Sequence, residues 1–460
     1  MTLSPQFTQQ IMDLMPQDGQ QLIDTIAQSE PSISIRLNDA KCTTSPAGAP
    51  QVPWCPLGFY LDNRPQFTFD TRFQAGLYYV QDASSMFLWH VIKALVKQPV
   101  RYLDLCAAPG GKTTAALSAL PQGSLVVANE IVPNRARSLR DNVIKWGSHN
   151  CLVTSNDPAA LGRLTHTFDV IAADVPCSGE GMMRKDDEAV AQWSPQLVKQ
   201  CAARQRDIIA DVWPALKPGG LLIYSTCTYN REENEEMIDW IAREFGARSV
   251  SVAIDEAWHI APAIASTHTA YRFLPHRTRG EGLFMAVLQK PDDQPLSPFK
   301  NKKPKSLSTK LPPSAKQARQ WLRQPEQFML TDIEGNIVAT HTSAVPLLEL
   351  LRAAGLNVLL SGITLGSIKG KNLIPDRALA QSTCLNYEAI NTADVDYATA
   401  IRYLQGQSVN IEAPRGFVLL THESVPVGWV NNLGNRANNL LPKALRIINP
   451  HTPSCPPQVL

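Results

Sequence analysis

The chain has 460 residues, of which 44% are hydrophobic and 18% are charged, and its formal net charge is +2. This length predicts two to four domains, and the hydrophobic content is enough for each to bury a core. A net charge so close to zero identifies no class of partner. Any nucleic-acid signal must therefore come from where the lysines and arginines lie.

No targeting or membrane signal is visible. The first residues, MTLSPQFTQQIMDLM, lack a basic segment followed by an apolar one, and no apolar run is long enough to cross a bilayer. We therefore expect a cytoplasmic protein with no membrane partner. Nine cysteines without a CxxC pair, and nine scattered histidines, argue against a disulfide framework or a metal site.

Residues 1–97 form a mixed segment in which 32–38, SISIRLN, predicts a strand and 82–96, DASSMFLWHVIKALV, a helix. We interpret this part as an N-terminal α+β accessory region that binds RNA.

Residues 98–290 alternate short apolar runs with amphipathic stretches. The alternation predicts a doubly wound α/β domain with a mostly parallel, Rossmann-like sheet. Strands are expected within 101–105, 123–130, 151–157, 168–174 and 219–226, and helices within 112–120, 134–147 and 188–216. In this architecture ligands bind at the carboxyl ends of the strands. Five polar side chains are expected there: Asp104, Glu130, Asp157, Asp174 and Cys227.

The composition changes after residue 290. Residues 291–323 predict a basic linker, because 298–323 carries eight lysines and arginines and no acid. A small middle module is expected over 324–384, with a hairpin around Glu334-Gly335-Asn336 and a helix over 344–355. The last module, 385–460, contains β-like runs such as RGFVLLTHESVPVGWV.

The segment DLCAAPGGKTT, 104–114, resembles a phosphate-binding P-loop, but Cys106 stands where that motif requires glycine. What remains is a Gly-Gly turn at the start of a helix, where backbone can approach a ligand closely. Lys112 is placed to reach a carboxylate. Glu130 is placed to accept hydrogen bonds from ribose hydroxyls, and Asp157 to meet an adenine edge.

Two cysteines directly follow apolar runs, Cys177 in DVPCSGEG and Cys227 in YSTCTY. A thiolate at a strand end is a strong nucleophile and adds readily to carbon 6 of cytosine, which activates carbon 5. Asp174 is suited to hydrogen-bond ring nitrogen 3 and the exocyclic amine during this addition. Five of the other thiols, Cys42, Cys151, Cys201, Cys384 and Cys455, are interpreted as inert small hydrophobes.

The motifs DLCAAPGGKT, DVPCSGEG and STCT, in this order, resemble those of the S-adenosylmethionine-dependent RNA cytosine-5 methyltransferases. The resemblance covers residues 1–290 and includes GLYYVQDASSM and RFLPHRTRGEGLFMAVL. It implies Cys227 as the nucleophile, Cys177 as the residue that assists adduct breakdown and product release, and no metal. The implied contacts to S-adenosyl-L-methionine are Cys106, Ala107, Ala108, Pro109, Gly110, Gly111, Lys112, Glu130, Asp157 and Asp174.

The basic linker, the middle module and the tail PVGWVNNLGNRANNLLPKALRI resemble a bacterial branch of this family that ends in a PUA-like RNA-binding module. That resemblance implies methylation of the cytosine at position 1407 of 16S rRNA within the assembled small ribosomal subunit. We expect a monomer that does not bind DNA. Candidate phosphate contacts are Arg415, Arg436, Lys443 and Arg446, together with segments 182–188 and 272–279.

Several alternatives stay open at this point. The target could be another rRNA or tRNA cytosine. A DNA cytosine-5 methyltransferase would use Cys177 as its nucleophile and leave Cys227 without a role. A P-loop nucleoside triphosphatase is motivated by PGGKTT, and a non-catalytic RNA-binding assembly factor would keep the fold without the activity.

Overall fold

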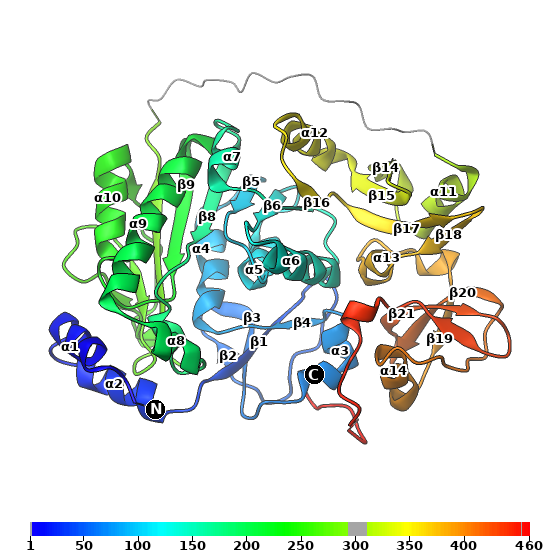
Figure 1. The fold of residues 1–460 in the computed structure, drawn as a ribbon, viewed down its shortest axis with the longest axis horizontal. Coiled ribbons are helices and arrows are strands. Elements are labelled where there is room, and N and C mark those ends of the chain that lie inside the picture. The colour runs from blue at the N-terminus through cyan, green and yellow to red at the C-terminus, as the bar shows by residue number, and fades with distance from the viewer. Residues whose placement is uncertain (1, 293–310, 452) are drawn as a thin grey trace.

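The computed structural model describes residues 2–292, 311–451 and 453–460. A ten-stranded sheet occupies its centre (Figure 1). Five parallel strands, in the order β7-β6-β5-β8-β9, form the middle of this sheet, which confirms the predicted doubly wound α/β architecture. These strands are β5 (Arg101–Asp104), β6 (Leu125–Asn129), β7 (Cys151–Thr154), β8 (Phe168–Asp174) and β9 (Leu216–Thr226).

Both faces of the parallel strands are buried under helices. Successive side chains point to opposite faces of the sheet, so neighbouring residues enter different cores. Tyr102 packs into one core and its neighbour Leu103 into the other. The first core is covered by helices α4 (Phe87–Leu95), α5 (Gly111–Ala119) and α6 (Pro133–Trp146), and the second by α7 (Pro158–Gly162), α9 (Pro195–Val212) and α10 (Glu235–Phe245).

Antiparallel strands extend the sheet at both edges, which the sequence did not predict. Beyond β9 lie β13 (Leu283–Gln289), β12 (Tyr271–Phe273) and β11 (Ala261–Pro262), while β10 (Arg248–Ser249) pairs with β13. At the opposite edge β16 (Val358–Leu360) pairs with β7.

The N-terminal region contains a second sheet, as its predicted strand at 32–38 required. Its order is β2-β3-β1-β4, and helices α1 and α2 lie beside short helix α8 (Figure 1). The bounds are α1 (Pro5–Leu14), α2 (Gly19–Gln28), β1 (Ile33–Leu37), β2 (Gln51–Val52), β3 (Cys55–Leu61), α3 (Thr71–Gln74), β4 (Tyr78–Val80) and α8 (Asp187–Gln192). Buried Arg36 joins this sheet to α5 by donating to the hydroxyl of Thr114 at 2.6 Å.

The C-terminal part contains two further four-stranded sheets (Figure 1). The predicted hairpin is confirmed, with Ile333 opposite Asn336 and Gly335 in the left-handed conformation at φ 80°. The first sheet comprises β14 (Phe328–Ile333), β15 (Asn336–His341), β17 (Ile363–Lys369) and β18 (Asn372–Pro375), and the second β19 (Asn391–Asp394), β20 (Gly416–His422), β21 (Val425–Asn432) and β22 (Ala437–Asn439). The accompanying helices are α11 (Pro313–Gln317), α12 (Val345–Ala353), α13 (Arg377–Gln381) and α14 (Tyr397–Leu404).

Packing departs from the predicted division at 324–384. Helix α12 buries Leu347, Leu348 and Leu351 in the core of the large sheet, and β16 extends that sheet. The remainder of the segment shares its core with Leu419 and Trp429 of the last module. The apolar face of α12 therefore joins the middle segment to the catalytic unit. Most of the predicted basic linker, 293–310, lies outside the described residues.

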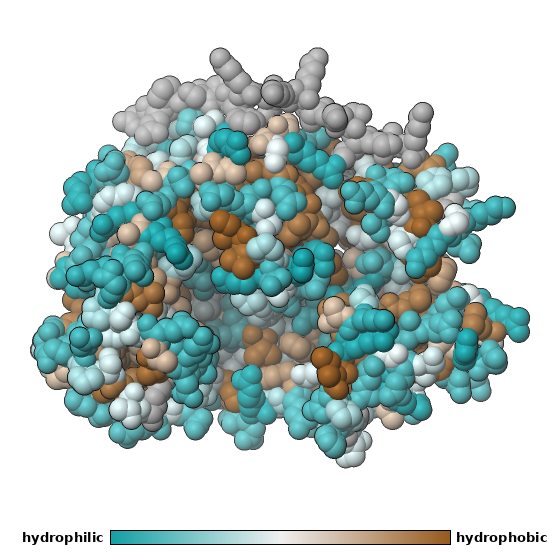
Figure 2. Space-filling model, in the orientation of Figure 1, coloured by the Kyte–Doolittle hydropathy of each residue, from teal (hydrophilic) through white to brown (hydrophobic). Residues whose placement is uncertain are grey.

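The face of the molecule seen in Figure 2 is largely hydrophilic, with hydrophobic residues in small separate groups. Such a surface suits polar partners better than a broad apolar interface. Within the described ranges, no helix is both long and apolar enough to cross a membrane.

Candidate active site

Cys177 and Cys227 come together because the strands that precede them are neighbours. Cys177 follows β8 and Cys227 follows β9, and these strands pair in parallel. The two Sγ atoms lie 3.3 Å apart. A disulfide bond is about 2.05 Å long, so the two residues are separate thiols in contact. This distance meets the geometric requirement for two cysteines that serve one substrate.

The two thiols differ in electrostatic environment. The hydrogen bond to Cys227 and burial raise the pKa of Cys177. Either sulfur could donate in this contact, and the raised pKa makes Cys177 the thiol that keeps a proton to donate. A sulfur that accepts this hydrogen bond is the better nucleophile of the two, because the thiolate is the reactive form.

Carboxylates hold the two cysteine loops in a reciprocal arrangement. Glu180, on the Cys177 side, accepts hydrogen bonds from the backbone N–H of Tyr229 at 2.7 Å and of Asn230 at 2.9 Å. Glu233, on the Cys227 side, accepts one from the backbone N–H of Ser178 at 3.0 Å. Each cysteine is thus held by an acid from the other's loop, and we call Glu180 and Glu233 the carboxylate clamp.

Side-chain contacts reinforce the carboxylate clamp. The Asn230 amide donates to Glu180 at 3.1 Å and to Glu233 at 2.8 Å, and the hydroxyls of Ser178 and Thr228 lie 2.9 Å apart. Burial raises the pKa of Glu233 to about 7 although Ser178 and Asn230 oppose this shift. Sequence reasoning missed both acids. The available signal was an acid within six residues of each cysteine.

Asp174 forms an ion pair with Lys112, whose Nζ lies 2.9 Å from Oδ2. The prediction that Lys112 reaches a carboxylate is therefore confirmed. Ser225 donates to the other oxygen of Asp174 at 2.8 Å. Burial acts to lower the pKa of Lys112, but Asp174, together with Cys227 and Asp104, raises it above its ordinary value. Lys112 is therefore a permanent cation within electrostatic range of Cys227.

Residues 105–110 join β5 to α5, and the predicted cofactor contacts from Cys106 to Lys112 lie in this loop and in the first turn of α5. Gly110 adopts φ 112°, a left-handed conformation that favours glycine, directly before the first turn of α5. Arg135 and Asn142 of α6 hold the loop by donating to the carbonyls of Ala108 at 3.0 Å and Pro109 at 2.9 Å. Two side chains of α6, seven residues apart, therefore hold the loop that leads into α5.

Cys106, Ala107 and Ala108 contribute to the packing under the loop. Burial raises the pKa of Cys106, with nearby Asp174 adding to the effect, so this thiol stays protonated. Below the loop, Thr113 donates to Asp104 at 2.6 Å, and burial raises the pKa of Asp104 to about 7.

Glu130 offers the clearest test of whether this site suits a nucleoside. The residue is 2% exposed, and Oε1 accepts a hydrogen bond from the backbone N–H of Val132 at 3.0 Å. Among the described residues Oε2 has no hydrogen-bond donor, although Arg135 lies 3.6 Å away. A buried carboxylate oxygen is costly without a donor. Ribose hydroxyls would supply donors, so the residues present fit the nucleoside part of S-adenosylmethionine.

Asp157 has a local structural role. Its Oδ1 accepts from the backbone N–H of Ala159 at 2.8 Å and so caps α7, and the residue is exposed. Contact between Asp157 and an adenine edge stays a prediction.

The two segments predicted to contact RNA, 182–188 and 272–279, each contain an arginine that forms an ion pair inside the protein. Arg272 is 1% exposed and pairs with buried Glu235, and Arg184 pairs with buried Glu281 at 2.7 Å. The prediction is wrong for these two arginines, because their charges are satisfied inside the fold. Arg277 is half-exposed and pairs with Asp18.

The four candidate phosphate contacts in the C-terminal module differ in exposure. Arg415, Arg436 and Lys443 are exposed. Arg446 is half-buried, contacts Gly406 and donates to the carbonyl of Leu441 at 3.4 Å, so its side chain helps to hold the module together. Across residues 2–292, 311–451 and 453–460 no three histidine, cysteine, aspartate or glutamate side chains are grouped to hold a metal ion.

Three family profiles match successive parts of the chain. Residues 3–83 match the N-terminal domain of 16S rRNA methyltransferase RsmF, and 94–289 match 16S rRNA methyltransferase RsmB/F. Residues 390–447 match the methyltransferase RsmF PUA domain.

Similar proteins extend over nearly the whole chain. Ribosomal RNA small subunit methyltransferase F of Shewanella loihica is 31% identical over 446 residues, covering 90% of this chain and 88% of its own. The protein of the same name from Escherichia coli O9:H4 is 30% identical and covers 90% of each chain.

Solved structures agree on the fold. A methyltransferase homolog from Pyrococcus horikoshii has a TM-score of 0.53 and 26% identity, covering 62% of this chain and 95% of its own. NSun6 from Pyrococcus horikoshii, solved with SFG, has a TM-score of 0.54 and 20% identity, covering 63% and 99%. Identity and coverage together show that this chain belongs to the ribosomal RNA small subunit methyltransferase F family.

Proposed function

We propose that this chain transfers a methyl group from S-adenosylmethionine to carbon 5 of a cytosine in rRNA, through a covalent adduct with Cys227. The observation that carries the proposal is the 3.3 Å contact between Cys177 and Cys227, beside the Lys112–Asp174 ion pair. A nucleophile, a proton-bearing helper and a fixed anion then lie around one base.

Cys227 is the nucleophile in this proposal. Its thiolate adds to carbon 6 of the cytosine, and the ring electrons move onto carbon 5 and nitrogen 3. Lys112 stabilises the thiolate by charge before addition, and the Cys177 thiol does so by its hydrogen bond.

Asp174 orients the base. Held by Lys112 and Ser225, its carboxylate accepts a hydrogen bond from the exocyclic amine. It accepts a second one from nitrogen 3, which takes a proton from solvent as the ring gains electron density. These hydrogen bonds strengthen as the ring gains electron density, so they favour the addition step. An acceptor that is already in place costs no reorganisation during the reaction.

The cofactor supplies an electrophilic methyl group that carbon 5 attacks. Glu130 would accept the ribose hydroxyls, and the loop from Cys106 to Lys112 would surround the cofactor. Asp157 would meet the adenine edge. After transfer, solvent water takes the proton of carbon 5. The electron pair of that C–H bond restores the carbon 5–carbon 6 double bond, and the carbon 6–sulfur bond breaks with its electron pair on the sulfur of Cys227. We assign Cys177 to this release, because it is a protonated thiol in contact with the departing sulfur.

The proposed substrate is the cytosine at position 1407 of 16S rRNA within the assembled small subunit, and the protein acts there as a cytoplasmic monomer. Family membership and the PUA domain match support a ribosomal RNA substrate. Base chemistry of this kind requires an unstacked nucleotide, which the enzyme obtains by flipping it or by acting on an open region.

The decisive experiment is transfer of labelled methyl to small subunits and to naked 16S rRNA, each with and without cytosine at position 1407. We expect transfer to assembled subunits that carry the cytosine and none to subunits in which it is replaced. Equal transfer to the replaced subunits would overturn the position, and transfer to naked RNA alone would overturn the assembled substrate.

A further inference from the structure

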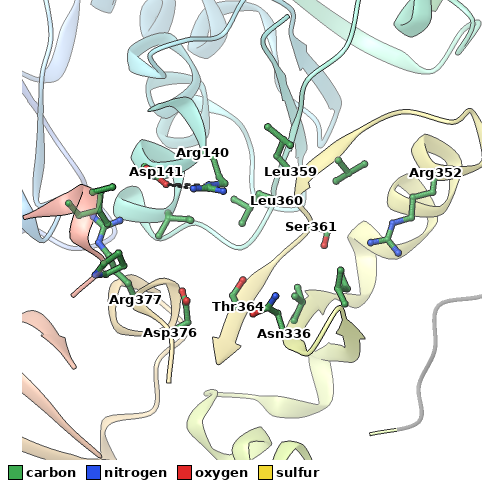
Figure 3. Close-up of a pocket in the computed structure, with 17 residues that line it drawn as sticks. Arg140, Asp141, Asn336, Arg352, Leu359, Leu360, Ser361, Thr364, Asp376 and Arg377 are labelled. Carbon is green, nitrogen blue, oxygen red and sulfur yellow. Dashed lines mark hydrogen bonds and ion pairs between the residues drawn. The ribbon is translucent and has the colours of Figure 1, made fainter. Parts of the chain in front are cut away.

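A groove of about 380 Å³ lies where the catalytic unit meets the C-terminal modules (Figure 3). Its walls come from α6 on one side and from β15, β16 and β17 on the other. The short helix Lys443–Leu445 closes one end through Ala444 and Leu445. Because three separate parts of the chain build it, the groove exists only in the assembled fold.

Three arginines from three helices line this groove. Arg352 of α12 lies at one end and Arg377 of α13 at the other, with Arg140 of α6 between them (Figure 3). The hydroxyls and amide of Ser361, Thr364 and Asn336 lie along the floor. The lining therefore presents a row of guanidinium groups above neutral hydrogen-bonding groups.

Two of these arginines have unmet hydrogen-bonding capacity. Arg140 pairs with the neighbouring Asp141 at 3.0 Å. Arg352 and Arg377 are half-buried, and among the described residues neither guanidinium forms a hydrogen bond or ion pair. Burial lowers the pKa of both arginines. A partly desolvated guanidinium without an anion is unfavourable, so the two positions suit negatively charged ligand groups.

The acids of the groove are already engaged. Asp141 is paired with Arg140, and Asp376 accepts from the backbone N–H of Ala378 at the start of α13. Arg377 lies within electrostatic range of both carboxylates but contacts neither of them. Their negative charges partly offset the positive charge of its guanidinium group. Counting the five charged side chains, the groove carries a net charge of +1.

The groove lies far from the cysteine pair. Four strand-to-strand steps separate β8 from β16 in the sheet order β8-β5-β6-β7-β16. Neighbouring strands are about 4.8 Å apart, so the separation is on the order of 20 Å. A long polymer can occupy the cysteine site and this groove at the same time. A single nucleotide is too short to span both sites.

We infer that this groove binds the sugar-phosphate backbone of the RNA substrate at a point remote from the target cytosine. Arginines in a row match successive phosphates, and the floor hydroxyls and amide match ribose hydroxyls. The inference rests on the proposed function for the identity of the RNA. It adds a second contact, formed jointly by the catalytic unit and the C-terminal modules.

The test compares RNA binding by wild-type protein with that of the double variant Arg352→Gln/Arg377→Gln. The probe is a fluorescent small-subunit rRNA fragment, with affinity measured from low to moderate salt. Loss of two phosphate contacts should weaken binding roughly tenfold at low salt and reduce the slope of log K against log salt by about 1.4 to 1.8. Arg243→Gln, at an exposed position on α10, is the matched control and should change neither quantity.

S-adenosylmethionine affinity and thermal midpoint should stay unchanged in the double variant, which separates loss of RNA contact from misfolding. If affinity and salt slope equal those of Arg243→Gln, the inference is overturned while methyl transfer can still stand. A different result would be that a nucleoside monophosphate binds the groove while the double variant binds RNA as tightly as the wild type. The site would then serve a free nucleotide, and the RNA assignment would fail. If the wild-type protein transfers no methyl group to the rRNA, the proposed function is refuted instead.

Discussion

Asp174 of β8 lies directly opposite Ser225 of β9 in the parallel register. Cys177 follows Asp174 by three residues and Cys227 follows Ser225 by two, so the register itself brings the thiols together. The hydrogen bond between the Ser225 hydroxyl and Asp174 spans the same pair of strands. One pairing of strands thus positions both cysteines and the acid that would bind the base.

Replacement of each cysteine should give opposite results. Cys227→Ala should abolish both methyl transfer and RNA adduct formation, because carbon 6 loses its nucleophile. Cys177→Ala should allow a covalent RNA adduct to accumulate, because release is impaired. Denaturing gels that resolve free from crosslinked protein measure this. Cys201→Ala, which removes a thiol on α9 outside the two cysteine loops, is the control. An adduct that accumulates in Cys227→Ala instead would reverse the two assignments.

Asp174→Asn should lower the single-turnover rate by roughly 10²- to 10³-fold, because the acceptor for the base loses its charge. A matched pair lies at the other end of the same two strands, where Lys217 contacts Asp169 at 2.6 Å. Asp169→Asn removes an equivalent acid away from the site and should leave the rate within a factor of two or so. A similar loss in both variants would mean that Asp174 acts only through stability.

Glu130→Gln should weaken S-adenosylmethionine binding by roughly ten- to a hundredfold. A charge-assisted hydrogen bond contributes about 1.5 to 3 kcal/mol, and the buried Oε2 is the acceptor available to the ribose. Calorimetric titration with the cofactor measures this change, and RNA affinity should be unaffected. Unaltered cofactor affinity would remove Glu130 from the binding site.

Glu233 should make stability fall as pH rises. Its pKa is raised from 4.5 to about 7 in the folded state, so the folded protein holds this proton more tightly than the unfolded chain. The contribution is full below pH 4.5 and is lost as pH rises through 7, by about 3 kcal/mol. Urea unfolding at pH 5 and pH 8 should show this component in the wild type but not in Glu233→Gln. Parallel pH profiles for the two proteins would contradict it.

Leu351→Ala should destabilise the catalytic unit although it lies outside residues 98–290. Its side chain is fully buried in the core of the large sheet, and such truncations cost about 2 to 5 kcal/mol. The half-exposed Glu349 on the same helix offers a control, since Glu349→Ala should cost less than about 0.5 kcal/mol. Chemical unfolding that leaves the catalytic unit as stable as before would show that α12 is only loosely docked.

The local pattern of apolar and polar residues was sufficient to predict the parallel strands of the core and the polar residues at their ends. Runs such as LVVAN and FDVIAAD alternate with amphipathic stretches, and this periodicity reports burial on both faces of a strand. The same pattern predicted that Asp104, Glu130 and Asp174 would stand at strand ends. The Gly-Gly turn motif separately predicted that Lys112 could reach a carboxylate, and Lys112 pairs with Asp174.

Other features depend on partners far away in the chain. Strand β16 is a three-residue apolar run, too short to show a period, and it becomes a strand only by pairing with β7 some two hundred residues earlier. Arg272 and Arg436 look equivalent in sequence. Glu235 makes one of them an internal ion pair, while the other is exposed.

The amino-acid sequence by itself determined the fold class and the family, and it supplied the side chains proposed for the chemistry, because these follow from local periodicity and short motifs. Tertiary structure alone decided the 3.3 Å sulfur contact, the carboxylate clamp and the groove between the modules. Each of these joins groups that are distant in the chain, and their distance depends on strand register and helix packing rather than on residue type.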